Sequence, residues 1–132
     1  IKDFAHSPSK LKATIDAVKN QFSNKNIIAV YELHTYSSFN QKFIKEYFNS
    51  MSSADMKLIY YDDEVLKKRG EFEINEKIIK DSFGSDDLIV ISKKSVLEES
   101  ILKINLHNSV LLMMSSGNFS SVDMLSLTKN NN

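Results

Sequence analysis

Two histidines follow predicted strands closely and could form part of one binding site. His6 comes just after the strand candidate 1–4, and His34 comes just after the candidate 26–33. Because the carboxyl ends of parallel strands meet at one edge of a sheet, we expect both imidazoles at that edge. There they could bind a carboxylate or phosphate oxygen. No third ligand stands at metal-like spacing, so a metal site is not predicted. His107 precedes a strand candidate, and we expect it at the opposite edge, structural or exposed.

The composition narrows the classes of function. Lys and Arg together number 17, as do Asp and Glu. This balance gives no global reason to bind nucleic acid or an anionic membrane. The chain has no cysteine, which excludes disulfides and cysteine nucleophiles. No apolar stretch approaches the roughly 20 residues that span a bilayer. We therefore expect a cytoplasmic protein, by default.

The elements that must position these histidines are predicted from hydrophobic spacing. In the segment 8–22, apolar residues recur at intervals of three and four, which predicts a helix that Ser7 can cap. Apolar runs predict strands at 1–4, 26–33, 56–61, 88–91 and 109–114. Further helices are expected at 39–51, 74–83 (ended by Gly84), 97–104 and around Val122 and Leu125. The helix 39–51 should bury Phe39, Phe43, Tyr47 and Met51, with Ile44 and Phe48 widening its apolar stripe.

This alternation predicts an α/β fold. We expect a three-layer Rossmann-like domain, with a mostly parallel sheet of about five or six strands and helices on both faces. Residues 1–132 suit a single domain. The chain starts with Ile1 and enters a strand directly, which indicates a cut through a longer polypeptide. We expect the polar tail Lys129–Asn132 to fray.

A distinctive motif opens the chain. The segment Asp3-Phe4-Ala5-His6-Ser7-Pro8 resembles D-[YF]-[AG]-H-x-P, which opens the C-terminal domain of Mur ligases. The Ala-Thr-Ile stretch at residues 13–15 resembles the helix that follows this motif in one branch of the family, which contains the UDP-N-acetylmuramate–L-alanine ligases and the murein peptide ligases. Residues 31–37, Tyr-Glu-Leu-His-Thr-Tyr-Ser, resemble F-[QE]-P-H-[RT]-Y-[ST] of that branch. Residues 114–119, Met-Ser-Ser-Gly-Asn-Phe, look like M-S-x-G-x-F of murein peptide ligases. The resemblance covers essentially the whole chain.

The resemblance implies an ADP-forming amide-bond ligase. Such enzymes use ATP and Mg²⁺ to activate a carboxylate of UDP-N-acetylmuramic acid as an acyl phosphate, which the amine of an amino acid or peptide attacks. The N-terminal and central domains of the same chain would be partners, with ATP and Mg²⁺ bound mainly by the central domain. This chain contains no G-x-x-x-x-G-K-[ST] loop, so we expect no activity, and no catalytic residue, in this domain alone. It would act in peptidoglycan synthesis or recycling.

The resemblance also implies roles for individual residues. Asp3 matches an aspartate that contacts the ATP ribose, and a carboxylate can accept hydrogen bonds from two vicinal hydroxyls. The expected substrate-binding residues lie in three segments: Phe4 and His6; His34, Thr35 and Ser38; and Ser115, Ser116, Gly117 and Asn118.

Several positions depart from the family pattern. Lys2 stands where an aspartate is common, Ser7 replaces a histidine, and Leu33 replaces a proline. Thr35 and Ser38 stand where many alanine-adding enzymes have arginines that hold the amino-acid carboxylate. Losing a guanidinium removes a bidentate clamp. The departures favour a peptide, with murein tripeptide preferred, over free L-alanine.

Other interpretations stay open. The acidic pair Asp62-Asp63 could bind Mg²⁺ or the ammonium of a diaminopimelate side chain, although a solvated loop is the more common outcome. A stand-alone flavodoxin-like or receiver-like binding module would also fit the α/β pattern. A receiver, however, needs an acidic cluster after its first strand and a lysine after its fifth, and neither is seen. A degenerate domain that lost catalysis is a third interpretation, motivated by Ser7, Thr35 and Ser38.

Overall fold

One parallel sheet forms the centre of the molecule. The computed structural model describes residues 2–3, 7–33, 44–62 and 75–115. Five strands of these segments form the sheet, in the order β1-β5-β2-β3-β4, and all four pairings are parallel. The strands are β1 (Lys2–Asp3), β2 (Asn26–Glu32), β3 (Met56–Tyr60), β4 (Ile89–Ile91) and β5 (Ser109–Ser115).

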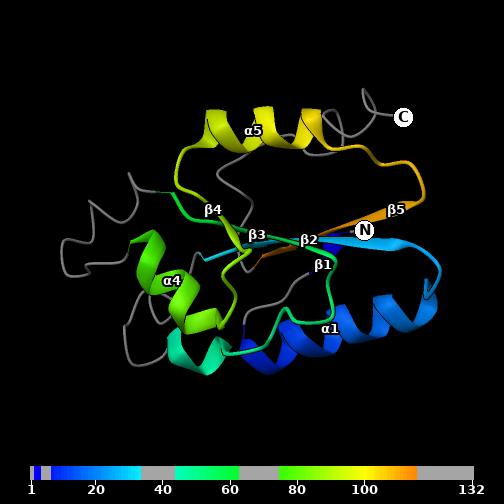
Figure 1. Cartoon of the computed structure of the whole chain (residues 1–132), viewed down its shortest axis with the longest axis horizontal. Helices are drawn as coiled ribbons and strands as arrows, with labels where there is room; N and C mark the ends of the chain where they lie inside the picture. Colours follow the sequence, from blue (N-terminus) through cyan, green and yellow to red (C-terminus); the bar gives the residue numbers. More distant parts are fainter. Residues whose placement is uncertain (1, 4–6, 34–43, 63–74, 116–132) are drawn as a thin grey trace.

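Helices cover both faces of this sheet. They are α1 (Pro8–Gln21), the 3-10 helix η2 (Lys45–Tyr47), α4 (Glu76–Phe83) and α5 (Lys94–Lys103). Figure 1 shows α5 on one side of the sheet and α1 and α4 on the other. The predicted three-layer α/β architecture is therefore confirmed.

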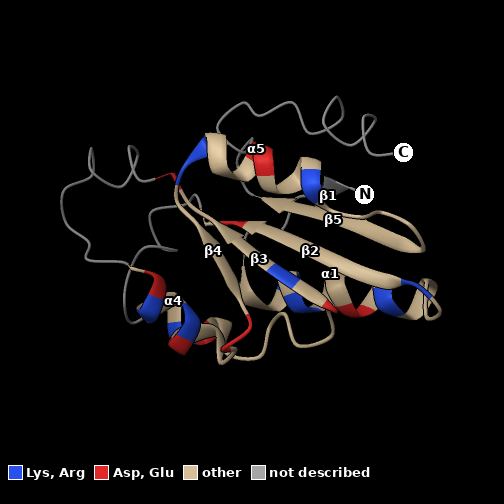
Figure 2. Ribbon diagram, turned by 45° about the horizontal axis from the view of Figure 1, so that its top comes forward, with Lys and Arg blue, Asp and Glu red and all other residues tan. Residues whose placement is uncertain are grey.

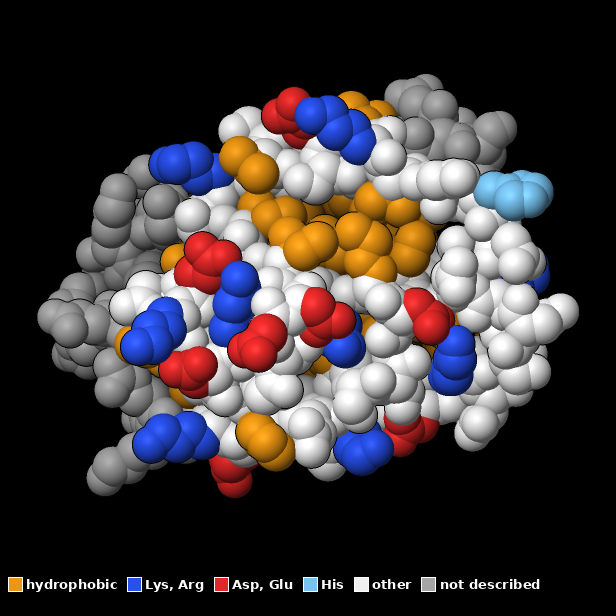
Figure 3. Space-filling view, viewed as in Figure 1, with side chains coloured by type: hydrophobic (Ala, Val, Ile, Leu, Met, Phe, Trp, Pro, Cys, Tyr) orange, Lys and Arg blue, Asp and Glu red, His pale blue; other side chains and the backbone are white. Residues whose placement is uncertain are grey.

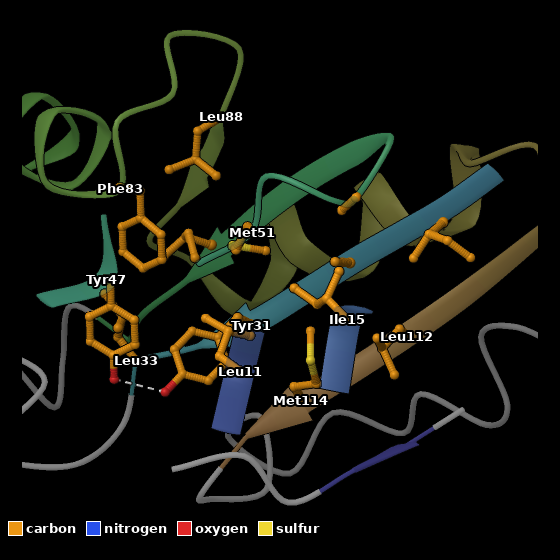
Figure 4. Packing of buried hydrophobic residues seen from close by; sticks show 14 of the residues in the cluster. Leu11, Ile15, Tyr31, Leu33, Tyr47, Met51, Phe83, Leu88, Leu112 and Met114 are labelled. Carbon is orange, nitrogen blue, oxygen red and sulfur yellow. Dashed lines mark hydrogen bonds between the residues drawn. The ribbon is translucent and has the colours of Figure 1, made fainter. Parts of the chain in front are cut away.

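The side chains of the strands alternate between two cores, as the period of two requires. One face of the sheet carries a cluster that we call the α1 core. In it, Ala29 and Tyr31 of β2, and Leu33 directly after β2, pack with α1, η2 and α4. Figure 4 shows part of this cluster. On the other face, the α5 core, Ile28 and Val30 pack against α5. Because both faces are covered, β2 reads as one continuous apolar run, not as an alternating one.

The order of the strands explains which helix lies on which face. Counted from β2, the strands β4-β3-β2-β5 have the order 3-2-1-4 of a Rossmann fold. The connections from β2 to β3 and from β3 to β4 run in one direction, and η2 and α4 pack in the α1 core. The connection from β4 to β5 runs back across β2 and β3, and α5 packs in the other core. Crossovers of a single hand place helices in this way.

Local signals set the ends of two helices. Ser7 caps α1, accepting a hydrogen bond from the Lys10 backbone N–H at 3.3 Å, and Pro8 occupies the first turn, both as predicted. Asn75 caps α4 through the Ile78 N–H at 2.9 Å. Gly84 ends α4 with a φ of 69°, the left-handed conformation that glycine adopts without strain.

The predicted helix 39–51 is wrong in its second half. Lys45–Tyr47 forms only a 3-10 turn, and Asn49 has a φ of 61°. Asparagine tolerates this left-handed conformation, which stops the helix. Met51 is buried as expected, but from a turn, whereas Phe48 is 61% exposed and does not widen a buried stripe. Residues 39–43 lie outside the described residues, as do the predicted helix around Val122 and the tail 129–132.

Candidate functional site

The carboxyl edge of the sheet is where α/β proteins of this kind bind ligands. Four strands end there in one row: Ser115 of β5 pairs with Glu32 of β2, which pairs with Tyr60 of β3, which pairs with Ile91 of β4. The Rossmann-like order changes direction between β5 and β2. The topological switch point therefore lies between Ser115 and Glu32, and the candidate site is centred there.

Glu32 and Ser115 form a buried polar pair at this switch point. The Ser115 hydroxyl donates a hydrogen bond to Glu32 Oε1 across 83 residues of sequence. Glu32 is 1% exposed and Ser115 is 5% exposed. By strand alternation both side chains point to the α5 side, in step with Val30 on β2 and Met113 on β5. Burying a carboxylate is unfavourable unless hydrogen bonds compensate for lost hydration, and Ser115 supplies one of them.

Asp3, predicted to contact the ATP ribose, also lies at this edge. Its backbone pairs with Met114, the residue before Ser115. Tyr31, the residue before Glu32, pairs with the same Met114 from the other side. With neighbouring strands about 4.8 Å apart, Asp3 and Tyr31 are about 10 Å from each other. The segments that carry His6 and His34 thus leave the sheet from strands two positions apart.

Leu33 uses the N–H that a proline would lack. Its backbone N–H donates to the Tyr60 carbonyl at 2.9 Å, and its side chain is 1% exposed in the α1 core. The departure from the family pattern at this position therefore adds one hydrogen bond beyond the end of the β2–β3 ladder. It anchors the chain directly before His34.

Beside this edge, the α1 core contains a second buried hydrogen bond. The hydroxyls of Tyr31 and Tyr47 lie 2.9 Å apart, and the ring of Tyr47 stacks on Phe83 with centroids 5.0 Å apart. Figure 4 shows the two hydroxyls pointing toward each other. Burial, reinforced by Tyr47, raises the pKa of Tyr31 well above its usual range, so this hydroxyl stays protonated. The pair fixes the end of β2 against η2.

The structure places only some of the predicted site residues. Of these, it brings Ser115 and the backbone of Asp3 to one edge. Asp62 follows β3 with intermediate exposure, and His107 is exposed in a turn before β5, at the opposite edge as expected. The others lie outside the described residues: Phe4, His6, His34, Thr35, Ser38, Asp63, Ser116, Gly117 and Asn118.

Glu32 is the site residue that sequence reasoning missed. It stands inside the second motif, but the sequence pattern assigns it only to the end of a strand. The usable signal was a charged residue directly after the apolar run 27–31, in a strand expected to be buried on both faces. Buried ionisable groups of this kind are candidates for functional roles.

A groove opens at the far end of the molecule from this site. It has a volume of about 670 Å³ and is lined by the first residues of β2, β3 and β5, namely Asn26, Met56 and Ser109, and by the end of α5. Figure 3 shows a hollow of hydrophobic side chains on this side of the molecule. Because it borders the amino ends of the strands, it is separate from the candidate site.

Charge and metal-binding groups do not single out another site in the described part of the chain. Figure 2 shows acidic and basic residues alternating along α4 and α5, rather than gathered by sign. Within residues 2–3, 7–33, 44–62 and 75–115, no three His, Asp or Glu side chains come together as metal ligands. In the same segments, no helix has the length and apolarity needed to cross a bilayer.

Three solved structures share this fold. No protein-family model matches the chain. A murein peptide ligase from Psychrobacter arcticus 273-4 is 22% identical, with a TM-score of 0.71 over 98% of this chain and 26% of that protein. A domain of a UDP-N-acetylmuramate:L-alanyl-γ-D-glutamyl-meso-diaminopimelate ligase from Haemophilus ducreyi is 22% identical, with a TM-score of 0.56 over 98% of this chain and 88% of that domain.

The third structure is a UDP-N-acetylmuramate-alanine ligase from Thermotoga maritima. It is 18% identical, with a TM-score of 0.62 over 97% of this chain and 24% of that protein. The chain thus spans about a quarter of the length of the first and third proteins. At these identities the comparisons establish a common fold. The resemblance seen in the motifs is confirmed at that level: this chain has the Rossmann-like α/β fold of a domain found in Mur-type ligases.

Proposed function

We propose that this chain is the C-terminal domain of a Mur-type ligase that joins an amino acid or a peptide to UDP-N-acetylmuramic acid. The observation that carries the proposal is the agreement of two independent features. Three motifs of the family occur in the right order in the sequence. The fold matches such ligases over nearly the entire chain. The whole protein would then contain the N-terminal and central domains as well, and would work in the cytoplasm, where ATP is available.

In this proposal the chain acts by binding and positioning. ATP and Mg²⁺, held mainly by the central domain, would supply the activation of the carboxylate. This domain would close over that site, bring the amine donor to it and exclude water. The switch point between β5 and β2 is the position at which open α/β sheets bind ligands, which supports this proposal.

Asp3 is the residue of this chain proposed to contact ATP. Its backbone pairs with Met114 at the end of β1, at the carboxyl edge of the sheet, which supports this proposal. An ionised carboxylate there can accept hydrogen bonds from both ribose hydroxyls. Phe4, His6, His34, Thr35, Ser38 and the residues from Ser115 to Asn118 are proposed to line the pocket for the amine donor.

The preferred amine donor is a murein tripeptide. Thr35 and Ser38 lack the guanidinium groups that would clamp the carboxylate of a free amino acid. A peptide can make contacts over a longer stretch and depends less on one clamp. Two of the three similar structures are ligases whose names specify a peptide.

The strand order weakens the rival interpretation of a receiver-like module. A flavodoxin-like sheet has the order 2-1-3-4-5. The observed order β1-β5-β2-β3-β4 differs from it and contains the Rossmann order instead.

ADP release by the full-length protein tests the proposal. The protein is incubated with ATP, Mg²⁺ and UDP-N-acetylmuramic acid, with murein tripeptide, L-alanine or no amine donor. The proposal predicts ADP release that depends on the amine donor and is fastest with tripeptide. Faster ADP release with L-alanine would support the proposed ligase activity but contradict the preference for tripeptide. Absence of donor-dependent release with either compound would reject the ligase.

A further inference from the structure

The buried pair of Glu32 and Ser115 joins β2 to β5 at the switch point. We propose that Glu32 is a positioning residue for the amine-donor pocket, and that it acts through Ser115. Glu32 accepts a hydrogen bond from the Ser115 hydroxyl and so orients it, and the hydroxyl then offers a lone pair to an N–H group of the incoming peptide. The inference rests on the proposed ligase function and deepens it, because it names the group on the donor that the site selects.

The location of the pair supports a role in binding. It stands in the last row of the sheet, between the two strands where the strand order reverses. Ligands of open α/β sheets bind outside the carboxyl ends at that point. Asp3, the proposed ATP contact, pairs with Met114, the neighbour of Ser115.

The burial of Glu32 in an apolar strand supports a role for this residue beyond core packing. The five preceding residues, 27–31, are buried and apolar, and the next buried residue, Leu33, is apolar too. A leucine at position 32 would fill the same space without desolvating a carboxylate. Burying a carboxyl group there is unfavourable, and buried ionisable groups are candidates for functional roles.

The direction of the hydrogen bond determines what Ser115 can bind. A serine hydroxyl has one proton and two lone pairs, and an ionised carboxylate only accepts. Since the proton of Ser115 goes to Glu32, the hydroxyl can meet a substrate only as an acceptor. Donating to a carboxylate also polarises the hydroxyl and strengthens it as an acceptor. Ammonium and amide N–H groups fit such an acceptor, whereas carboxylate, phosphate and carbonyl oxygens do not.

A simpler role would be a purely structural contact that holds β2 to β5. The two roles predict different kinetics. Loss of a purely structural contact would lower the stability and change the KM values for all substrates together. A positioning pair would affect the KM for the amine donor while leaving the KM for ATP unchanged, and the effects of Glu32 and Ser115 would not be independent.

The test compares Glu32→Ala, Glu32→Gln, Ser115→Ala and the double variant Glu32→Ala with Ser115→Ala in the full-length protein. KM and kcat are measured for ATP and for murein tripeptide. Met113→Ala is the matched control, because Met113 is 4% exposed on the same strand and face. It should lower the thermal midpoint without changing the tripeptide KM relative to ATP.

We expect Glu32→Ala to raise the KM for tripeptide about tenfold, with the KM for ATP within about twofold of wild type. Glu32→Gln should retain most of the wild-type affinity for tripeptide, because its amide oxygen can accept the hydrogen bond from the Ser115 hydroxyl. The double variant should match Ser115→Ala alone, since Glu32 has nothing to orient once the hydroxyl is gone.

Two outcomes would overturn the inference while the ligase stands. One is an unchanged tripeptide KM in both alanine variants of an active enzyme. The other is an equal rise of both KM values that follows the loss of stability, which would show that the pair is a purely structural contact. If the wild-type protein shows no donor-dependent ADP release, the proposed function fails and this inference fails with it.

Discussion

Asp55 is bound to Ile27 across the amino ends of β3 and β2. The Ile27 backbone N–H donates to Asp55 Oδ2 at 2.7 Å, and Lys19 Nζ of α1 lies 2.8 Å from the same oxygen. One carboxylate oxygen thus connects two strands and a helix at the edge opposite the candidate site. The hydrogen bond from Lys19, followed by the one from Ile27, lowers the pKa of Asp55 below its usual value.

This contact predicts a pH-dependent stability. Because the folded pKa of Asp55 lies below its unfolded value of about 3.9, the stabilisation is present at neutral pH and is lost as the pH falls through the folded pKa. Asp55→Asn should therefore lower the free energy of unfolding at pH 7, and the difference from wild type should shrink toward pH 3. Urea unfolding at both pH values measures it. Asp86→Asn, at an exposed position, is the charge-matched control and should show a smaller effect. A constant difference across this range would contradict the account.

The hydroxyls of Tyr31 and Tyr47 should be energetically coupled. Tyr31→Phe or Tyr47→Phe deletes one member of a buried hydrogen bond, and we expect each to lower the free energy of unfolding by about 1–3 kcal/mol. The double variant removes both hydroxyls and should cost clearly less than the sum of the two. Urea unfolding of all three variants gives the coupling. Additive losses would show that the 2.9 Å contact contributes nothing.

Gly84 should be intolerant of a side chain for two separable reasons. Its φ of 69° is left-handed, which costs an alanine about 1–2 kcal/mol. A Cβ at this position would also lie 2.8 Å from Cδ2 of the Phe48 ring. Gly84→Ala should therefore destabilise the protein by more than the conformational cost alone.

The Phe48→Ala background separates these two costs, because it removes the ring but not the backbone strain. There, Gly84→Ala should cost only about 1–2 kcal/mol. The same loss in both backgrounds, measured by urea unfolding, would mean that the exposed ring moves aside freely.

Asp3 and His6 should matter for turnover but little for folding. We expect Asp3→Ala to raise the KM for ATP about tenfold, because two ribose hydrogen bonds to a carboxylate are lost, and we expect His6→Ala to act on the amine donor instead. Steady-state kinetics of the full-length protein separate the two effects, and circular dichroism checks the fold. Wild-type kinetics in both variants would show that Asp3 and His6 are not part of the site.

The secondary structure was largely predictable because its signals are local. Ser7 and Pro8 indicate the start of α1, and Gly84 indicates the end of α4. Buried parallel strands such as β2 are continuous apolar runs, which are conspicuous in a sequence. The second half of the predicted helix 39–51 is wrong because the apolar spacing continues to Met51, whereas the backbone leaves the helical conformation at Asn49.

The arrangement of the candidate site was less predictable because it is non-local. A strand pattern gives no strand order, so the switch point between β5 and β2 could not be located beforehand. Ser115 was predicted from a family motif, but its partner Glu32 lies 83 residues away. Only the sheet register brings the two together.

The mass of the UDP-linked product tests the central claim most directly. The full-length protein is incubated with UDP-N-acetylmuramic acid, murein tripeptide, ATP and Mg²⁺, and the nucleotide-sugar is analysed by mass spectrometry. A Mur-type ligase forms one amide bond and releases ADP and phosphate. The account predicts a product heavier than UDP-N-acetylmuramic acid by the tripeptide less one water. Unchanged UDP-N-acetylmuramic acid, with tripeptide and with L-alanine alike, would contradict it.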